Sequence, residues 1–310
     1  MGDLYYLVGL PGSGKSTFAK QLAKENGALI FSSDEIRKEI GADGGDSTKH
    51  GEVFNILHTR IIDSLSKGCD CIYDATNISY KNRVRFIKYL NSSKVDNVNK
   101  ICVIVATPYE ICKEFNKKRK AVVPDEVIDR MYKAWNTPYY SEGWDEIYAY
   151  YREPAYMTYN GTPLYNVKKY YHWNQNNPHH CDGLGKHNAR TSETLIKNGM
   201  KDANLIHAAM IHDFGKLATE TRDDKGISHY YNHANVGAYE ALFFDYNTNS
   251  DNNDFDPITI SFLVNHHMEP FSWKSSDWNK GKEKFKKKYG DKELTKILVL
   301  HNADIVRNQV

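Results

Sequence analysis

A glycine-rich segment, Gly9-Leu-Pro-Gly-Ser-Gly-Lys-Ser-Thr17, constrains this chain more than any other stretch. It directly follows the apolar run Leu4–Val8 and precedes apolar residues at helical spacing, so strand, loop and helix occur in the order of a phosphate-binding loop. Its glycines let backbone N–H groups turn inward, and the helix places its positive dipole end beneath the phosphates. The segment predicts nucleotide binding.

The motif also predicts a role for its polar side chains. Lys15 reaches the β and γ oxygens of a nucleoside triphosphate, and the Ser16 hydroxyl binds Mg²⁺. The expected cofactor is ATP with Mg²⁺. The remaining residues predicted to bind the nucleotide are Gly9, Gly12, Ser13, Gly14 and Thr17.

Length and composition favour two globular domains. A chain of 310 residues exceeds one typical domain, and 40% hydrophobic with 26% charged residues is ordinary for a globular protein. The sequence has no apolar run long enough to span a membrane and no secretion signal after Met1, so we expect a cytoplasmic protein without a membrane partner. The net charge of +2 is too small to indicate nucleic-acid binding by itself. The five cysteines, an odd number without a metal-type pair, are expected to be reduced and mostly buried.

The first half alternates apolar strands with amphipathic helices. Strands are expected at 4–8, 28–31, 69–73, 101–106 and 143–151, with helices between them, which predicts an α/β domain with a parallel sheet. Ligands bind at the carboxyl ends of such strands. Asp34 and Asp74 follow two of these strands and are therefore expected to face the same crevice as Lys15.

Phosphoryl transfer needs a carboxylate to deprotonate the attacking hydroxyl and cations to hold phosphates. Asp34 suits the first role, although Ser33 or Asp34 could instead cap the following helix. Arg37 lies on the same helix face and is expected to hold an acceptor phosphate. Asp74 either assists Mg²⁺ or holds Arg37 in place. Arg119, in a basic run before Pro124, is the candidate lid residue that neutralises transition-state charge.

The first half resembles the 5′-polynucleotide kinase module of phage end-healing enzymes. The resemblance rests on the glycine-rich loop, Ser33-Asp-Glu-Ile-Arg37, Asp74-Ala-Thr-Asn77 with Arg83, and Arg119 before the segment 123–131. It implies that Asp34 is the general base for a 5′-hydroxyl, that Arg37 contacts the acceptor phosphodiester and that Arg119 acts on ATP. Asn77 and Arg83 would then line the substrate pocket.

The segment from Ala155 to about Asn177 is rich in Tyr, Asn, Pro and His and shows no periodicity, which predicts a linker. Its aromatic side chains either stack on bases of a single strand or, as we favour, pack between domains. The predicted boundaries are 1–153 for the P-loop kinase domain, 154–175 for the linker and 176–310 for the second domain.

Histidine is concentrated after residue 170, where all 13 histidines except His50 and His58 occur. An apolar helix ends at His212-Asp213, and a second carries Asp304 in an apolar stripe, where a carboxylate needs a cationic partner. Imidazole and carboxylate donors suit Mn²⁺, Fe²⁺, Co²⁺, Ni²⁺ or Zn²⁺. The second half therefore predicts a transition-metal site.

This half resembles the HD phosphohydrolase superfamily. The resemblance is carried, in order, by the segments 178–187, 212–216, 231–237, 265–270 and 302–304. It implies an all-helical domain that holds a metal with His187, His212, Asp213 and Asp304. His233 and either His266 or His267, of which His267 fits better, would hold a second ion or steer the phosphate, and Lys216 would contact a phosphate oxygen.

Together the two resemblances predict an enzyme that heals the ends of broken RNA or DNA. One half adds a 5′-phosphate, the other removes a 3′-phosphate or a 2′,3′-cyclic phosphate, and a separate ligase seals the ends. One alternative is a small-molecule kinase fused to a nucleotide phosphohydrolase. Another is a nucleotide-sensing regulator with a non-catalytic HD domain.

Overall fold

The computed structural model describes residues 2–42, 47–93, 95–151, 169–177, 182–243, 255–273 and 275–305. The chain divides into two units, the first formed by Met1–Ile128 and Pro138–Thr158 and the second by Asp129–Thr137 and Tyr159–Val310. This division differs from the predicted boundaries chiefly in the segment 129–137. No helix in the described ranges is long and apolar enough to cross a bilayer.

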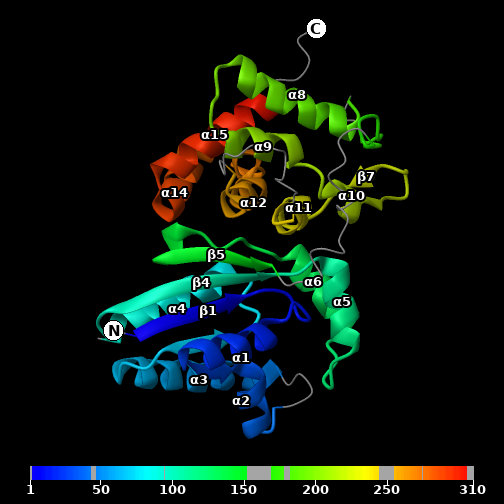
Figure 1. The fold of residues 1–310 in the computed structure, drawn as a ribbon. Coiled ribbons are helices and arrows are strands. Elements are labelled where there is room, and N and C mark those ends of the chain that lie inside the picture. Colours follow the sequence, from blue (N-terminus) through cyan, green and yellow to red (C-terminus); the bar gives the residue numbers. More distant parts are fainter. Residues whose placement is uncertain are drawn as a thin grey trace. The chain divides into compact units, whose positions relative to one another are not determined.

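A five-stranded parallel sheet forms the centre of the first unit, as the sequence predicts (Figure 1). Its spatial order is β2-β3-β1-β4-β5. The strands are β1 (Gly2–Val8), β2 (Leu29–Ser32), β3 (Cys71–Asp74), β4 (Val98–Ala106) and β5 (Glu146–Tyr151). In register, Leu4 of β1 lies opposite Cys71 of β3 and Lys100 of β4. The carboxyl ends of β1, β2 and β3 consequently lie at one edge of the sheet.

Helices flank this sheet, and they follow the strands in the expected alternation. They are α1 (Lys15–Asn26), α2 (Ser33–Glu39), α3 (His50–Ser66), α4 (Tyr80–Ser92) and α5 (Tyr109–Lys117), with 3₁₀ turns at Ser47–Lys49 and Tyr140–Glu142, and α6 (Asp125–Lys133) continues into the second unit. The expected helices are therefore present, with ends shifted by a few residues. The N-cap position of α2 is Ser32, whose side chain makes no capping hydrogen bond, and Ser33 and Asp34 both lie in the first turn of the helix.

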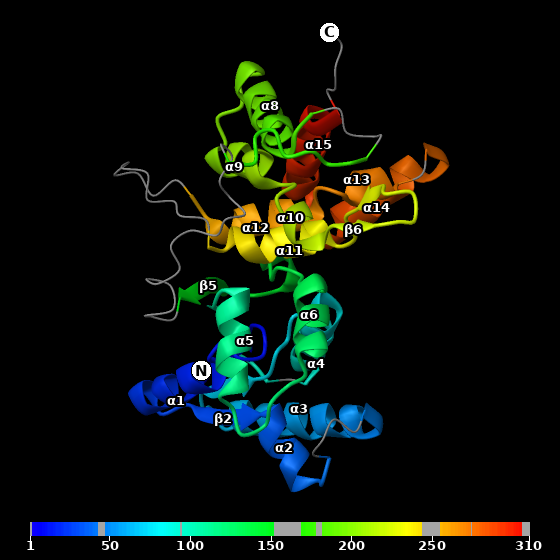
Figure 2. The same ribbon diagram turned by 90° about the vertical axis from the view of Figure 1, so that its right-hand side faces the viewer.

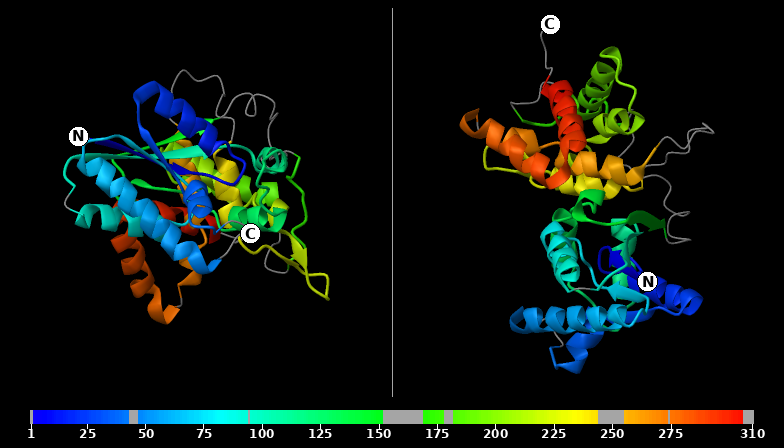
Figure 3. Two further views of the ribbon diagram at one scale, coloured as in Figure 1. Left: turned by 90° about the horizontal axis from the view of Figure 1, so that it is seen from below. Right: turned by 90° about the vertical axis from the view of Figure 1, so that its left-hand side faces the viewer.

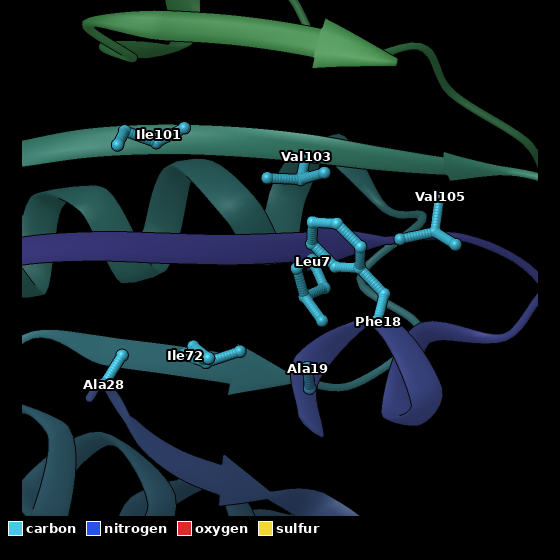
Figure 4. Close-up of a cluster of buried hydrophobic side chains, with 8 residues drawn as sticks. All are labelled: Leu7, Phe18, Ala19, Ala28, Ile72, Ile101, Val103 and Val105. Carbon is cyan, nitrogen blue, oxygen red and sulfur yellow. The ribbon is translucent and has the colours of Figure 1, made fainter. Parts of the chain in front are cut away.

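Side chains of β1 point alternately to the two faces of the sheet and contribute to an apolar layer on each face. Leu7 belongs to the layer beneath α1, with Phe18 and Ala19 of that helix and Val103 of β4 (Figure 4). Tyr6 points to the other face, where its ring lies 5.4 Å from the ring of Phe86 on α4. Because successive strand residues face opposite sides, one strand supplies both layers and fixes the loop that follows it.

Cysteine burial agrees with reduced thiols. Cys71, Cys102 and Cys112 are buried and Cys69 is half-buried, and all four are free. Cys181 lies outside the described residues.

The second unit is mainly helical, with one short antiparallel hairpin (Figure 2). Helix α9 packs against both α8 and α12, and α15 packs against α8 and α14. Figure 3 shows the C-terminal helices α14 and α15 from two further sides in orange and red. The elements are α8 (Leu184–Lys197), α9 (Ala203–Ile211), α10 (Lys216–Thr219), β6 (Thr221–Arg222), β7 (Ser228–His229), α11 (His233–Ala241), α12 (Pro257–His266), α13 (Glu269–Ser272), a 3₁₀ turn (Ser275–Asp277), α14 (Trp278–Tyr289) and α15 (Asp291–Ile305).

The segment Asp129–Thr137 is part of the core of the second unit. The ring of Trp135 is fully buried and meets the ring of Tyr239 on α11 edge-on at 4.9 Å. The Thr137 backbone N–H donates to Asn265 Oδ1 on α12 over 3.1 Å. Replacing a fully buried tryptophan with alanine lowers the free energy of unfolding by about 3 to 5 kcal/mol. The second unit therefore includes residues from well before the predicted linker.

The aromatic residues of the predicted linker can be followed only in part. Tyr156, Tyr159 and Tyr165 lie outside the described residues. Trp173 packs within the second unit, where its ring lies 6.1 Å from that of Tyr230.

Candidate active sites

The phosphate-binding loop connects β1 to α1. Its backbone is left-handed at Gly12, with φ of 83°, and at Gly14, with φ of 94°. A Cβ atom added at Gly12 would lie 2.1 Å from the carbonyl oxygen of Cys112, so a larger residue cannot fit there. Glycine is required at both positions, because other residues rarely adopt this conformation. The loop then enters α1 at Lys15, so the positive end of the dipole of α1 lies at the loop.

Lys15, Ser16 and Asp74 lie together at this loop. The Lys15 ammonium donates to the carbonyl oxygens of Gly9 and Leu10 over 3.0 and 2.8 Å. Ser16 Oγ donates to Asp74 Oδ2 over 2.7 Å. Burial raises the pKa of Asp74, while Lys15 and Ser16 oppose that rise. A hydroxyl beside a buried carboxylate is a fitting pair of groups for Mg²⁺, the first of the two predicted roles of Asp74.

Asp34 and Arg119 are brought together from widely separated parts of the first unit. Arg119 Nη2 lies 3.2 Å from Asp34 Oδ2, and 61% of the Asp34 side chain is exposed. Arg37 contacts His50 Nδ1 over 3.3 Å. Asp34 is therefore accessible to a substrate hydroxyl and contacts the predicted lid residue, and Arg37 is oriented by a histidine to which the sequence assigned no role.

Arg83 and Asn77 have structural contacts instead of the predicted pocket positions. The Arg83 side chain is fully buried and pairs with the fully buried Glu142, with Nε–Oε2 and Nη2–Oε1 distances of 2.7 Å. Asn77, at a φ of 51°, donates from Nδ2 to the Leu7 carbonyl oxygen over 2.8 Å. The prediction that Arg83 lines the substrate pocket is wrong, because no surface of this side chain reaches solvent. Asn77 is almost fully buried as well, and its amide holds the strand that leads into the loop.

Replacing Arg83 with methionine is expected to lower the free energy of unfolding of the first unit by about 3 to 5 kcal/mol, because Glu142 would remain as an uncompensated buried charge. Urea titration with circular dichroism measures this change. The double variant Arg83→Met/Glu142→Gln should recover a large part of the loss, since the amide oxygen introduced at position 142 can still accept from Trp144 Nε1, which now donates to Glu142 over 3.0 Å. An equal loss in both variants would contradict the ion-pair explanation.

In the second unit, four predicted metal ligands converge from three parts of the chain. His187 Nε2 lies 2.9 Å from Asp304 Oδ1 and 3.5 Å from Asp213 Oδ2. His212 Nε2 lies 3.6 Å from each of these carboxylates. These residues come from α8, the end of α9 and α15. Atoms that bind one ion at about 2.1 Å lie roughly 3 to 3.5 Å apart, which is close to the separations seen here.

Asp213 extends the cluster through its second oxygen. His233 Nε2 and His267 Nε2 lie 3.3 and 3.6 Å from Asp213 Oδ1, and they lie 3.2 Å from each other. His266 instead faces Glu269 and packs against the ring of Tyr289 at 4.7 Å. Of the two adjacent histidines, His267 is therefore the one at the cluster. The ligand atoms of His212, Asp213 and His267 form a second group compact enough for an ion.

The charge distribution of this cluster favours a cation. Burial opposes ionisation of Asp213, but Lys216 and His212 hold its pKa well below the ordinary value. Burial lowers the pKa of His212, yet Asp213 and Asp304 raise it to about 9. Burial lowers the pKa of His267 to about 4, which leaves its imidazole neutral and able to bind a metal. The carboxylates of Asp213, which is buried, and of Asp304, which is largely buried, thus favour a cation at this site.

One atom of the cluster fits a metal ligand in particular. His212 Nε2 is buried and has no hydrogen-bond partner among the described residues, while Nδ1 contacts the Ala209 carbonyl oxygen at 2.8 Å. A carbonyl contact keeps the proton on Nδ1, so Nε2 can coordinate once a bound cation replaces its own proton. The donor set of imidazoles and carboxylates suits a divalent transition metal. His187, His212, Asp213 and Asp304 would hold such an ion.

Lys216 and Gln175 complete this site. Lys216 Nζ donates to Asp213 Oδ2 over 2.6 Å and to Gln175 Oε1 over 2.9 Å. Gln175 is buried although the sequence predicts it within a linker, and no periodic pattern around it signals this role. Gln175 lies beside the cluster because the fold brings it to Lys216, which is 41 positions later in the sequence.

The fold and the loop geometry agree with a comparison against known protein families. Residues 4–138 match the AAA domain family. The first half of the chain thus contains a nucleotide-binding P-loop domain of kinase type, with a parallel sheet flanked by helices.

Three curated relatives each align with slightly less than half of this chain. They are the L-seryl-tRNA(Sec) kinase of Methanococcus maripaludis (28% identical; 46% of this chain, 56% of the relative), protein kti12 of Schizosaccharomyces pombe (27%; 46% and 54%) and the "Putative bifunctional polynucleotide phosphatase/kinase" of Acanthamoeba polyphaga mimivirus (28%; 47% and 32%). The alignments span about half the length of the first two relatives and a third of the last.

A solved structure described as a "putative kinase" from Chloroflexus aurantiacus also matches, with a TM-score of 0.41 and 14% identity over 48% of this chain and 85% of the other.

Proposed function

We propose that this protein heals the ends of broken nucleic-acid strands. Its first unit would phosphorylate a 5′-hydroxyl with ATP, and its second would remove a 3′-phosphate or a 2′,3′-cyclic phosphate. The observation that carries the proposal is that one chain holds both a P-loop with an accessible Asp34 and a cluster of histidines and carboxylates close enough to hold a metal ion. A mimivirus relative named as a bifunctional polynucleotide phosphatase/kinase supports the polynucleotide substrate.

In the kinase reaction, Asp34 would take the proton of the 5′-hydroxyl as its oxygen attacks the γ-phosphorus of ATP. The new P–O5′ bond forms, the bond from the γ-phosphorus to the bridging oxygen breaks, and ADP leaves. Lys15 would turn from the carbonyl oxygens of Gly9 and Leu10 to the phosphates. Arg119 would move from Asp34 to the transferring phosphoryl group, which leaves the carboxylate unpaired and basic at the moment of proton transfer.

In the second unit, His187, His212, Asp213 and Asp304 would hold a divalent ion, which supplies Lewis acidity toward a phosphoryl oxygen. Lys216 would bind a non-bridging oxygen of the phosphate, since its ammonium already lies at Asp213. His233 and His267 would position the phosphate from the other side of Asp213. These residues orient the phosphorus for attack by water, whose oxygen replaces the ester oxygen of the strand.

An end-group assay on the full chain tests both halves of the proposal. RNA and DNA strands bearing a 5′-hydroxyl and a 3′-phosphate are incubated with γ-labelled ATP, Mg²⁺ and a series of transition metals. We expect label on the 5′ end and release of phosphate from the 3′ end. Lys15→Met should remove the first product and leave the second. Labelling of free nucleosides with inert oligonucleotides would instead support a small-molecule kinase and overturn the proposal.

A further inference from the structure

Helix α14 carries a concentration of positive charge that no other described helix or strand of this nearly neutral chain has. It contains six lysines and one glutamate in its sequence WNKGKEKFKKKY, whereas the whole protein has a net charge of +2. Of these lysines, Lys286 pairs with Asp291 at 2.9 Å. Lys280, Lys284 and Lys287 are exposed, with no ion pair to any described residue.

These three lysines form one stripe. At 100° per residue, positions 280, 284 and 287 fall within about 60° of one another around the helix, and they follow each other at intervals of about 6 and 4.5 Å along its axis. Phe285 and Tyr289 are buried and lie on the opposite side of the same helix. The lysine stripe, defined as Lys280, Lys284 and Lys287, therefore faces solvent while the apolar side packs on the unit.

The packed side of α14 contacts residues that adjoin the predicted metal ligands in sequence. The ring of Tyr289 contacts that of His266, the neighbour of His267, at 4.7 Å. At the other end of α14, the ring of Trp278 lies 5.8 Å from that of His301 on α15. His301 precedes Asp304 by three residues, which is about 4.5 Å along the helix axis. The two histidines that α14 contacts, His266 and His301, are thus one and three positions in sequence from the predicted ligands His267 and Asp304. Figure 1 shows α14 beside α15.

An open groove of about 670 Å³ lies at the Trp278 end of α14. It is lined by Ser276, Asp277, Trp278, Asn279 and Lys280. An aromatic ring and a lysine in one groove provide the two contacts that proteins use for single strands, base stacking and backbone neutralisation. The single acidic residue, Asp277, lies before the stripe begins.

We propose that the lysine stripe and the Trp278 groove bind a single-stranded polynucleotide and lead its 3′ end to the cluster. This rests on the proposed phosphohydrolase function and names its substrate as a strand rather than a mononucleotide. The charge complementarity between three exposed ammonium groups and successive phosphodiesters selects this occupant. Small phosphomonoesters would reach the cluster without using the stripe.

The test compares two triple variants of the full chain with equal loss of charge. Lys280→Gln/Lys284→Gln/Lys287→Gln removes the stripe, and Lys20→Gln/Lys24→Gln/Lys197→Gln removes three exposed lysines on α1 and α8. Fluorescence anisotropy measures binding of labelled single-stranded RNA and DNA with a 3′-phosphate over a salt series. Phosphate release is followed with the same strands and with p-nitrophenyl phosphate.

For the stripe variant we expect binding to weaken roughly 10- to 100-fold at 0.1 M salt and the slope of log K against log salt to fall by about 2, since each phosphate contact contributes about 0.7. Its KM for the strand should rise while hydrolysis of p-nitrophenyl phosphate stays unchanged. The control variant should match the wild type. The proposed docking surface would be contradicted if the stripe variant bound strands with unchanged affinity and salt slope. It would also be contradicted if the variant lost the same factor of affinity for duplex DNA as for single strands. Failure of wild-type protein to hydrolyse either substrate would instead contradict the proposed function, and the binding measurements would still decide the docking surface.

Discussion

Replacing His212 with alanine is expected to lower metal-dependent phosphate release by more than the roughly 100-fold that loss of an outer-shell partner of a metal site costs. The reason is that His212 Nε2 lies 3.6 Å from both Asp213 and Asp304 and belongs to both ion-sized groups of donor atoms. Removal of His212 would leave the carboxylates of Asp213 and Asp304 with one neighbouring imidazole fewer. The measurement combines phosphate release from a 3′-phosphorylated strand with the metal content of the purified protein.

The matched control is His207→Ala, on the helix that leads to His212. His207 Nδ1 contacts the Ala203 carbonyl oxygen and its ring packs on Phe255 at 4.1 Å, away from the cluster. This variant should keep its metal and its hydrolysis. Kinase activity should persist in both variants, and an unchanged circular dichroism spectrum should show that the second unit remains folded. Full hydrolysis and full metal content in His212→Ala would contradict the assignment of this cluster as a metal site.

Sequence alone could predict the α/β fold because each element of the first unit carries its own local signal. The loop Gly9–Thr17 predicts a strand before it and a helix after it, and the buried part of β4, residues 101–106, is a continuous apolar run of the kind found in parallel strands. Parallel topology then follows from the alternation of strands and helices. The placement of Asp34 near the loop was predictable for the same reason, since β1 and β2 end at one edge of the sheet.

The segment 129–137 shows that local sequence patterns do not identify packing partners that are distant in the sequence. Trp135 and Tyr132 are apolar enough for any core, and nothing in their spacing says that they pack with Tyr239 and Glu240, more than 100 positions later. Arg83 shows the same limit for a charged residue. A motif resemblance suggested a ligand contact, but its partner Glu142 lies 59 positions away, and only their approach in space shows that both are buried.

The histidine cluster could be predicted from the sequence only in part. Adjacent His212-Asp213 at a helix end and Asp304 in an apolar stripe are visible in the sequence as unusual residues. Which histidines join them depends on helix orientation. Neighbouring side chains on a helix point about 100° apart, so that His267 reaches Asp213 while His266 packs among aromatic rings.

Replacing Asp34 with asparagine is expected to lower kcat for 5′-phosphorylation by about 10²- to 10⁴-fold, the usual contribution of a general base. Asparagine keeps the size of the side chain and can still accept a hydrogen bond from Arg119, which lies 3.2 Å from Asp34 Oδ2. It cannot take the proton of the attacking hydroxyl. The KM for ATP should change little, because Lys15 and the loop that bind the nucleotide remain. Initial rates with γ-labelled ATP and a 5′-hydroxyl strand separate these two constants.

Glu35→Gln provides the control, since Glu35 is the next residue on α2, is also exposed, and changes the charge by the same amount. If the loss of activity came from the electrostatic potential around the loop, both variants would be impaired alike. Proton abstraction by Asp34 predicts a loss in Asp34→Asn alone. An Asp34→Asn enzyme with wild-type kcat would show that another group accepts the proton, and the exposed carboxylate beside Arg119 would then serve only to hold the lid residue.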